Sequence, residues 1–158
     1  MDRRQFSITT ASFLGAAGNS SGEAAENRIK PWRVGVIGHT GRGDYGHGLD
    51  TVWRHFPRVK VTAIADANSD GLTRELGKLG LNAASGYLDY RIMLKKVQPE
   101  IVAICPRHLD QHCDMILAAV NAGAKGIYVE KPFVQTPQQL DEVVKACQMN
   151  GTKLAVAH

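Results

Sequence analysis

Apolar residues in this chain alternate between short compact runs and stripes with helical spacing, from Arg33 to the end of the sequence. The compact runs occupy residues 33–38, 59–66, 100–105, 126–129 and 153–157, with a weaker candidate at 83–86. Continuous apolar runs of about 4–8 residues are typical of strands buried on both faces of a parallel sheet. The pattern therefore predicts six such strands.

Segments with helical spacing separate these runs. Three apolar stripes recur at intervals of three and four residues: Leu49, Val52, Trp53 and Phe56; Leu72, Leu76 and Leu79; and Leu109, Cys113, Ile116, Leu117 and Val120. A fourth helix has the clearest ends, with Thr136 as its cap, Pro137 in its first turn, Gln139 completing a capping box and Gly151 as its stop. Its expected buried face is Leu140, Val143, Val144 and Cys147. Strands that alternate with helices predict an α/β fold with a doubly wound parallel sheet and helices on both faces.

Composition and charge exclude several classes of protein. The chain of 158 residues has 44% hydrophobic and 22% charged residues, as folded globular domains do. Its 19 Lys and Arg exceed its 15 Asp and Glu by four, but the basic residues are interleaved with acids, so a nucleic-acid surface is not expected. No uncharged apolar run reaches the ~18–20 residues that a membrane span needs. The three cysteines, Cys105, Cys113 and Cys147, lack CxxC spacing and read as small buried apolar residues.

Residues 1–30 read differently from the rest and predict an export signal and linker. Arg3-Arg4 and Phe6 precede a weakly apolar, uncharged stretch at 8–18, and small residues follow as far as Ala25. These are the parts of an export signal, and the arginine pair resembles the twin-arginine type, although Asp2 stands where Ser or Thr is preferred. Export to a bacterial periplasm or cell envelope is the prediction. A disordered or amphipathic tail, with a cytoplasmic protein, is the alternative.

A glycine-rich turn follows the first predicted strand and predicts a phosphate-binding loop. Gly38 and Gly43 match the first and third positions of GxGxxG, while Thr40 takes the middle position and Gly41 follows it. Backbone N–H groups in such a turn approach a pyrophosphate, and the N-terminus of the next helix adds favourable partial charge. Arg42 is a candidate to pair with phosphate.

Asp66 closes the second predicted strand, 23 residues beyond Gly43. An acid about 20 residues after the glycine loop typically binds the ribose 2′-hydroxyl of a dinucleotide and repels a 2′-phosphate. NAD is therefore favoured over NADP, with NADP as the second choice. The alternative role of Asp66 is to cap the next helix.

Five short motifs resemble the glucose-fructose oxidoreductase and inositol dehydrogenase family, Gfo/Idh/MocA. They are Tyr87–Tyr90, Val102–Pro106, His112, Ala122-Gly123 and Glu130–Pro132. The resemblance implies an N-terminal Rossmann domain of residues 31–158 that binds NAD(P). It also implies a nicotinamide-dependent oxidoreductase for sugars, polyols or related hydroxyl compounds. Arg107 departs from the family, which often has Asn after the proline.

The resemblance also implies roles for single residues. Lys131 would lie beside the nicotinamide and the reacting carbon as the catalytic residue, and Glu130 near the cofactor ribose. Pro106 and His112 would also belong to the cofactor site. A surface lysine paired with Glu130 is the plainer interpretation of Lys131. His108 and His112 are four residues apart, as in some metal sites, but the sequence offers no third ligand and no metal is expected.

The sequence leaves the catalytic competence of the chain open. Members of the resembled family carry a second α+β domain that supplies most of the substrate pocket, and no such domain is evident here. One hypothesis is an oxidoreductase of which this chain is a part. The other is a nucleotide-binding module without its own catalysis, truncated or dependent on a partner. A short-chain dehydrogenase is disfavoured because no Tyr-x-x-x-Lys pair is present. Oligomers remain open, and the substrate cannot be read from this chain.

Overall fold

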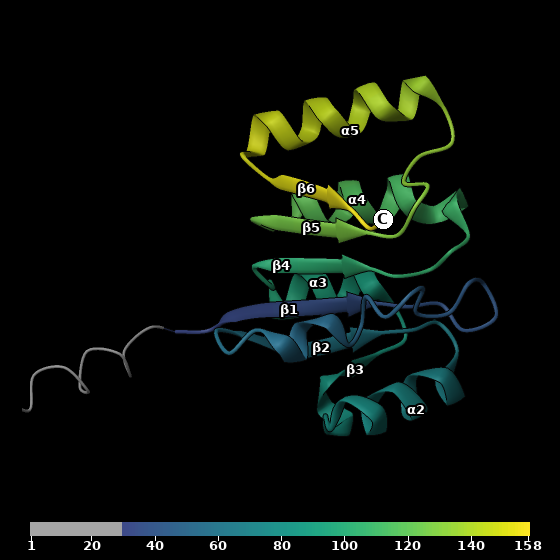
Figure 1. Cartoon of the computed structure of the whole chain (residues 1–158), viewed down its shortest axis with the longest axis vertical. Helices are drawn as coiled ribbons and strands as arrows, with labels where there is room; N and C mark the ends of the chain where they lie inside the picture. The colour runs from purple at the N-terminus through teal and green to yellow at the C-terminus, as the bar shows by residue number, and fades with distance from the viewer. Residues whose placement is uncertain (1–29) are drawn as a thin grey trace, which may run out of the picture.

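Six parallel strands form one sheet in the order β3-β2-β1-β4-β5-β6, in a computed structural model that describes residues 30–158 (Figure 1). The strands are β1 (Trp32–Ile37), β2 (Val59–Ala65), β3 (Gly86–Tyr87), β4 (Ile101–Ile104), β5 (Gly126–Val129) and β6 (Lys153–Val156). The chain runs outward from β1 to β3 and then returns to pair β4 with β1. This reversal is the switch point of a doubly wound sheet, so the predicted fold class is confirmed.

Helices cover both faces of the sheet. They are α2 (Ser69–Leu79), α3 (Tyr90–Val97), α4 (His112–Asn121) and α5 (Pro137–Asn150), with short 3-10 turns at η1 (Val52–His55), η2 (Ala83–Ser85) and η3 (Leu109–Gln111). In Figure 1 α3 and α4 lie behind the strands. Their side chains form one apolar cluster with Val102 and Ile104 of β4, while Leu72 and Leu76 of α2 pack with Val34 and Val36 of β1 in a second cluster. Successive side chains of a strand point to opposite faces of the sheet, so each strand contributes residues to both clusters.

Local signals placed the ends of the helices correctly. The Thr136 hydroxyl accepts a hydrogen bond from the Gln139 N–H at 3.2 Å, and Pro137 opens α5 as predicted. Gly151 ends that helix in the left-handed conformation. Asn68 caps α2 by accepting from the Gly71 N–H at 2.8 Å.

The prediction of a helix over Leu49–Phe56 was wrong. The structure has turns there and a single 3-10 turn, η1, before Pro57. Gly48 takes a φ of +88° at its start, and the N–H groups of Thr51 and Val52 both donate to the Gly48 carbonyl oxygen, so the chain turns here before Pro57 stops it. Tertiary contacts also hold it, since the buried Asp50 carboxylate pairs with Lys78 of α2.

Two further elements differ from the prediction. The weak strand expected at 83–86 is shifted: residues 83–85 form the 3-10 turn η2, and the strand β3 begins at Gly86. The helix α3 was not predicted. Its signals were present in the sequence: Asp89 caps it by accepting from the Arg91 N–H at 2.8 Å, and Met93 and Leu94 are its buried residues.

The buried face of α5 was predicted only in part. Val143 and Cys147 are buried, whereas Leu140 and Val144 are 39% and 42% exposed. The helix packs against α4 by one narrow stripe, and its other apolar positions face solvent.

Burial of the three cysteines is confirmed. Cys105, Cys113 and Cys147 are all buried free thiols, and burial raises the pKa of each. Within residues 30–158 no helix is long and apolar enough to cross a membrane. The predicted export signal lies outside the described residues.

Candidate functional site

Two cavities open at the carboxyl edge of the sheet, one on each side of the switch point. The first, of about 270 Å³, lies over the ends of β1 and β2 and is lined by Gly38, His39, Asp66 and the residues from Leu88 to Arg91 among others. The second, of about 250 Å³, lies at the ends of β5 and β6, with Glu130 and Lys131 in its lining. Doubly wound sheets bind ligands at this edge, so both cavities stand where a ligand is expected.

The glycine loop follows β1, but no α-helix begins at its end. Residues 38–51 form turns, and the next element is η1. The expected contribution of a helix N-terminus to phosphate binding is therefore missing from this loop. Several loop N–H groups bond within the chain: those of His39 and Asp44 form a two-residue bridge, and that of Gly41 donates to the Asp44 carboxylate at 3.0 Å.

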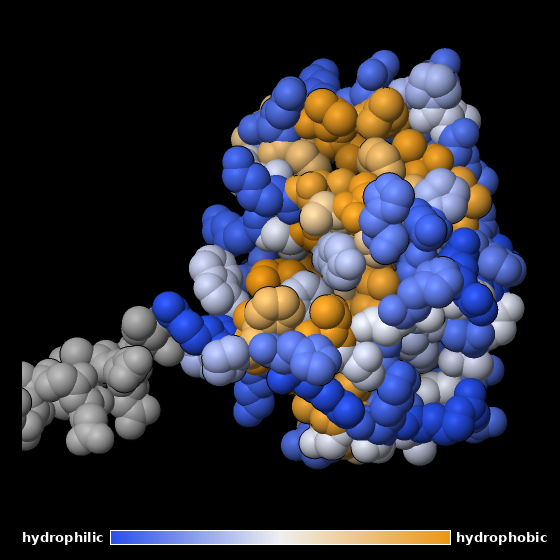
Figure 2. Space-filling model, viewed as in Figure 1, coloured by the Kyte–Doolittle hydropathy of each residue, from blue (hydrophilic) through white to orange (hydrophobic). Residues whose placement is uncertain are grey.

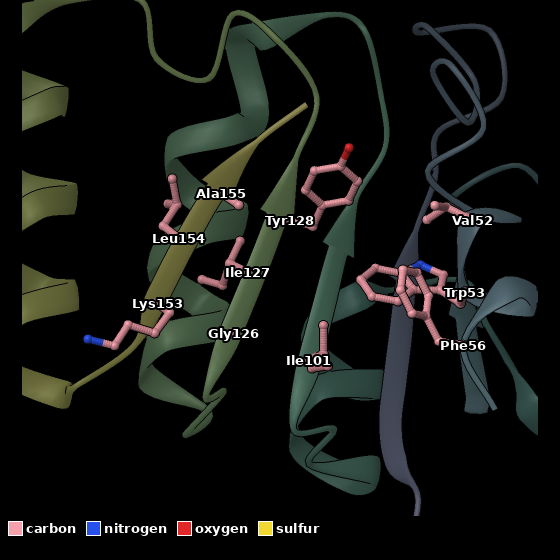
Figure 3. Close-up of a pocket in the computed structure, with 10 residues that line it drawn as sticks. All are labelled: Val52, Trp53, Phe56, Ile101, Gly126, Ile127, Tyr128, Lys153, Leu154 and Ala155. Carbon is pink, nitrogen blue, oxygen red and sulfur yellow. The ribbon is translucent and has the colours of Figure 1, made fainter. Parts of the chain in front are cut away.

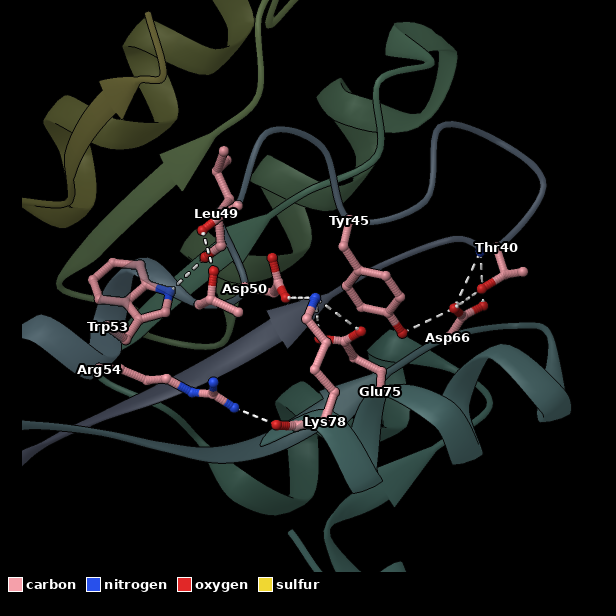
Figure 4. Close-up of polar contacts among 11 residues, drawn as sticks. Thr40, Tyr45, Leu49, Asp50, Trp53, Arg54, Asp66, Glu75 and Lys78 are labelled. Carbon is pink, nitrogen blue, oxygen red and sulfur yellow. Dashed lines mark hydrogen bonds and ion pairs between the residues drawn. The ribbon is translucent and has the colours of Figure 1, made fainter. Parts of the chain in front are cut away.

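Asp66 lies at the end of β2 and lines the first cavity, but its carboxylate is 1% exposed. It accepts hydrogen bonds from the Thr40 N–H at 3.1 Å, the Thr40 hydroxyl at 2.7 Å and the Tyr45 hydroxyl at 2.9 Å (Figure 4). The Asn68 N–H donates to it as well, at 2.9 Å. These donors occupy most of the lone pairs of the carboxylate. Asp66 therefore fastens the glycine loop to β2, and a bond to ribose stays a prediction.

Gly43 marks the closest approach between the glycine loop and the loop after β4. Its φ is +93°, and a Cβ at this position would lie 2.2 Å from the backbone nitrogen of Arg107. The small residue therefore admits a second backbone here, and the predicted contact of Gly43 with a cofactor stays a prediction. Arg42, predicted to pair with phosphate, forms an exposed ion pair with Asp110 of η3. Gly41 lies at an open part of the loop, with no atom within 4 Å of where its Cβ would be.

His112 is completely buried at the start of α4 and joins two loops of the carboxyl edge. Its Nε2 lies 2.7 Å from the carbonyl oxygen of Pro106, and its Nδ1 lies 3.0 Å from that of Pro132. Both ring nitrogens are thus engaged by carbonyl oxygens, so the pair His108 and His112 cannot hold a metal. Pro106 is buried as well and offers this contact only through its carbonyl group. The contribution of both residues to a cofactor site stays a prediction, and in this structure it is indirect.

Glu130 and Lys131 follow β5 and differ in exposure. The Glu130 side chain is buried, and it accepts from the Lys131 N–H at 3.2 Å and from the His47 N–H at 3.2 Å. Its Oε1 lies 3.0 Å from His47 Nδ1. The Lys131 side chain is exposed and lines the second cavity. The sequence offered no partner for His47, because the two members of this contact are 83 residues apart.

A buried ionic cluster lies beneath the glycine loop, between the segment after it and α2 (Figure 4). Lys78 pairs with both Asp50 and Glu75, whose side chains are 2% and 7% exposed. Burial, together with the neighbouring Asp50 carboxylate, raises the pKa of Glu75 to about 7. The contacts of the same cluster lower the pKa of Asp50. The cluster ties α2 to the segment that follows the glycine loop.

An apolar groove of about 410 Å³ lies on the sheet face that α3 and α4 leave free. Figure 3 shows Val52, Trp53 and Phe56 on one side of it, with residues of β5 and β6 on the other. The rings of Trp53 and Tyr128 meet edge to face, with centroids 6.1 Å apart. Figure 2 shows hydrophobic surface continuing from here over β5, β6 and α5. The polar groups in its lining are the Trp53 indole, the Tyr128 phenol and the Lys153 amine.

The two cavities of the carboxyl edge offer different side chains. The first places the side chains of Asp89, Tyr90 and Arg91 around a space at the end of β2. The second places the ammonium group of Lys131 and the imidazoles of His47 and His158 at the ends of β5 and β6. Among residues 30–158 no group of three or more His, Cys, Asp or Glu side chains could hold a metal ion.

Comparison with known proteins gives one family and a consistent fold. A family profile described as an oxidoreductase family with an NAD-binding Rossmann fold matches residues 32–158. Inositol 2-dehydrogenases of Salmonella typhimurium and Salmonella agona are 30% identical over 96 residues, which is 61% of this chain and 28% of theirs. The chain thus spans well under half the length of these curated relatives.

Solved structures agree with these matches. An NAD-binding oxidoreductase from Klebsiella pneumoniae is 30% identical, with a TM-score of 0.65 over 80% of this chain and 34% of that chain. The WlbA dehydrogenase from Bordetella pertussis, solved with NADH and UDP-GlcNAcA, has a TM-score of 0.68 at 20% identity, over 81% of this chain and 38% of its own. At that identity the second likeness shows the fold alone.

Proposed function

Since the chain belongs to the oxidoreductase family with an NAD-binding Rossmann fold, we propose that it binds a nicotinamide dinucleotide along the carboxyl edge of its sheet. The reaction that this binding serves is hydride transfer between the cofactor and a hydroxyl compound of the sugar or polyol class. NAD is the expected cofactor, with NADP as the second choice.

The observation that supports the proposal is the pair of cavities on either side of the switch point. Asp66 lines the cavity at the end of β2, and Lys131 lines the cavity at the end of β5. A dinucleotide that crosses the edge at the glycine loop would place its adenosine half in the first and its nicotinamide in the second. A separate cavity is thus available for the adenosine half and for the nicotinamide half of the cofactor.

The described residues would divide the work as follows. A bound nicotinamide supplies the ring carbon that accepts a hydride. Lys131 is exposed at the mouth of the second cavity, where its ammonium group can stabilise the alkoxide that forms as a hydroxyl loses its proton. Glu130 fixes the backbone of Lys131 by accepting its N–H. Thr40 and Asp66 hold the glycine loop in place beside the cofactor.

Calorimetric titration of the chain with NAD and NADP, followed by turnover assays on a panel of polyols and sugars, tests the proposal. We expect NAD to bind, and Lys131→Ala to keep that binding while it loses roughly 100-fold or more in turnover. Lys145→Ala, a change of an exposed lysine on α5, is the matched control. Binding without turnover in the parent chain would favour a nucleotide-binding module that has no catalysis of its own. Absence of binding to either dinucleotide would overturn the proposal.

The substrate class rests on the relatives. Two curated relatives are named inositol 2-dehydrogenase, and inositol is a polyol. The second cavity offers cationic and hydrogen-bonding side chains, which suit a hydroxyl-rich compound. Because the chain spans 28% of those relatives, substrate and activity are proposals for the whole protein.

Export and self-association complete the proposal. The Arg3-Arg4 pair and the apolar stretch after it support export by a twin-arginine route. Replacement of both arginines by lysine should retain the protein in the cytoplasm, and unchanged fractionation would contradict export. Oligomers stay a prediction, which sedimentation of the purified chain at several concentrations tests.

A further inference from the structure

An exposed ion pair joins the glycine loop to the segment between β4 and α4. The Arg42 guanidinium pairs with the Asp110 carboxylate of η3, which lies 68 residues away along the chain. The two side chains are 45% and 42% exposed, so the pair lies at the surface of the molecule. The loop residue that the sequence singled out as a phosphate ligand is thus bound to a carboxylate of the protein itself.

Two further contacts hold the same two segments together. Nδ1 of His39 lies 2.8 Å from Oε1 of Gln111, and the Arg107 N–H donates to the Gly43 carbonyl oxygen at 3.4 Å. These contacts, like the ion pair, join the loop after β1 to the segment after β4, and β1 and β4 are the neighbouring strands of the switch point. Doubly wound sheets bind the pyrophosphate of a dinucleotide in this crevice. The place expected for phosphate is therefore bridged by side chains of the chain itself.

A second carboxylate occupies the backbone of the glycine loop. The Gly41 N–H donates to the Asp44 carboxylate at 3.0 Å. A backbone N–H in a tight turn and a guanidinium are both groups that bind phosphate oxygens. In this loop each of them is engaged by a carboxylate, that of Gly41 by its neighbour Asp44 and that of Arg42 by Asp110. The glycine loop thus has the donors of an anion site, and acidic side chains of the same chain occupy them.

The two possible partners of Arg42 differ in strength. An ion pair between exposed side chains contributes little to stability, because water screens the charges and two long side chains lose freedom. A phosphate group accepts two parallel hydrogen bonds from an arginine, and such charge-assisted pairs are among the strong ones. Arg42 should therefore exchange Asp110 for phosphate when a pyrophosphate reaches the loop. Because both side chains of the ion pair reach solvent, this exchange requires no unfolding.

We propose that Asp110 is an internal competitor of the cofactor: its carboxylate holds Arg42 in the empty protein, and the pyrophosphate of the dinucleotide displaces it. This inference rests on the proposed function. Binding of the dinucleotide must replace an existing partner of Arg42, so Asp110 lowers the affinity of the site without touching the cofactor. Its effect passes through Arg42, and this dependence distinguishes the exchange from general charge repulsion.

Calorimetric titration of NAD into the parent chain, Asp110→Asn, Arg42→Gln and the double variant tests this dependence. We expect Asp110→Asn to bind NAD about two- to fivefold more tightly, as the loss of an exposed ion pair implies. Arg42→Gln should bind more weakly than the parent, and Asp110→Asn should add nothing to it, because no guanidinium remains to be released. Asp114→Asn, which removes an exposed carboxylate from the first turn of α4, is the matched control for charge. A gain from Asp110→Asn that persists beside Arg42→Gln, or that Asp114→Asn equals, would overturn the proposal.

Inorganic pyrophosphate separates this inference from the proposed function, because it carries the anion alone. In the chain labelled with ¹⁵N arginine, pyrophosphate should shift the Nε–H signal of Arg42. Asp110→Asn should reach half of that shift at about a two- to fivefold lower pyrophosphate concentration. The signal of Arg58, an exposed arginine just before β2 at the opposite edge of the sheet, should stay in place. An Arg42 signal that pyrophosphate does not move, or equal affinities of the parent and Asp110→Asn for pyrophosphate, would overturn the inference. A chain that exchanges Asp110 for pyrophosphate in this way but binds no NAD would instead refute the proposed function.

Discussion

The Asp66 carboxylate holds the glycine loop against β2, and Tyr45 is the donor that best tests this role. The Tyr45 hydroxyl lies 2.9 Å from Asp66. Burial, reinforced by Asp66, raises the pKa of Tyr45 far above its usual range, so the hydroxyl keeps its hydrogen and remains a donor. Removal of that hydroxyl leaves a buried carboxylate with one donor fewer, which is costly in a low-dielectric setting.

Tyr45→Phe should therefore destabilise the fold by about 1.5–3 kcal/mol, the range for a hydrogen bond to a charged group. Urea denaturation followed by circular dichroism measures the loss. Tyr90→Phe is the matched control, because the half-buried Tyr90 hydroxyl has no hydrogen-bond partner in the described part of the chain. Equal stability of Tyr45→Phe and the parent chain would show that Asp66 does not depend on this donor.

At the scale of residues, the sequence predicted which side chains lie at the carboxyl edge of the sheet more readily than the hydrogen bonds that they form. The spacing from the glycine loop singled out Asp66, and a short motif singled out Lys131; each lines one of the two cavities. The donors of Asp66 were not predictable, because Thr40 and Tyr45 lie 26 and 21 residues away and meet it only once β1 and β2 pair. His47 lies 83 residues from Glu130, beyond any local pattern, although its two flanking glycines marked an unusual backbone.

At the scale of elements, strands were easier to predict than the loop that joins β1 to β2. The run at 33–38 is apolar because both faces of β1 are covered over residues 34–37, and this requirement is visible in the sequence. The segment 38–56 has an apolar stripe as well, but its conformation depends on Lys78 of α2 and Glu130 after β5. Because of these contacts with distant elements, the segment forms turns and η1 although its apolar residues have helical spacing.

The ionic cluster that joins this segment to α2 predicts a pH dependence of stability. Glu75 has its ordinary pKa of 4.5 in the unfolded chain and about 7 in the folded one. Between these two pH values Glu75 is protonated in the folded chain and ionised in the unfolded chain. The free energy of unfolding therefore falls as pH rises from about 4.5 to 7, and the stabilisation from the protonated Glu75 is lost above that range. Asp50, Lys78 and Tyr45 are the charged or titratable groups around it.

Glu75→Gln should remove this dependence, because a neutral amide cannot lose a proton. The difference in unfolding free energy between the parent and Glu75→Gln should change by roughly 2–3 kcal/mol over that interval. Chemical denaturation at a series of pH values measures it, with Glu142→Gln on the exposed side of α5 as the control. A constant difference across pH 4.5 to 7 would mean that Glu75 titrates normally in the folded state.

At the scale of the whole molecule, the two faces of the sheet are covered unequally. One face carries α3 and α4 along its length, whereas the other has α2 at the β3 end and only η1 toward β4. The sequence predicted helices on both faces but could not show this asymmetry, because it follows from the failure of one stripe to become a helix. The result is an apolar groove with Phe56 at its rim, 51% exposed.

That groove should bind an apolar fluorescent dye such as anilinonaphthalene sulfonate, since exposed apolar patches of this kind bind such probes. Phe56→Ser should weaken dye binding about fivefold, because the half-exposed ring offers roughly 1 kcal/mol of apolar contact. The substitution should leave the unfolding free energy nearly unchanged, as the ring is already half in solvent. Met149→Ser on α5 removes an even more exposed apolar side chain that does not line the groove, so it should leave dye binding as it is. If the chain binds no dye, or if both variants lose it equally, the groove is not an accessible surface of the folded protein.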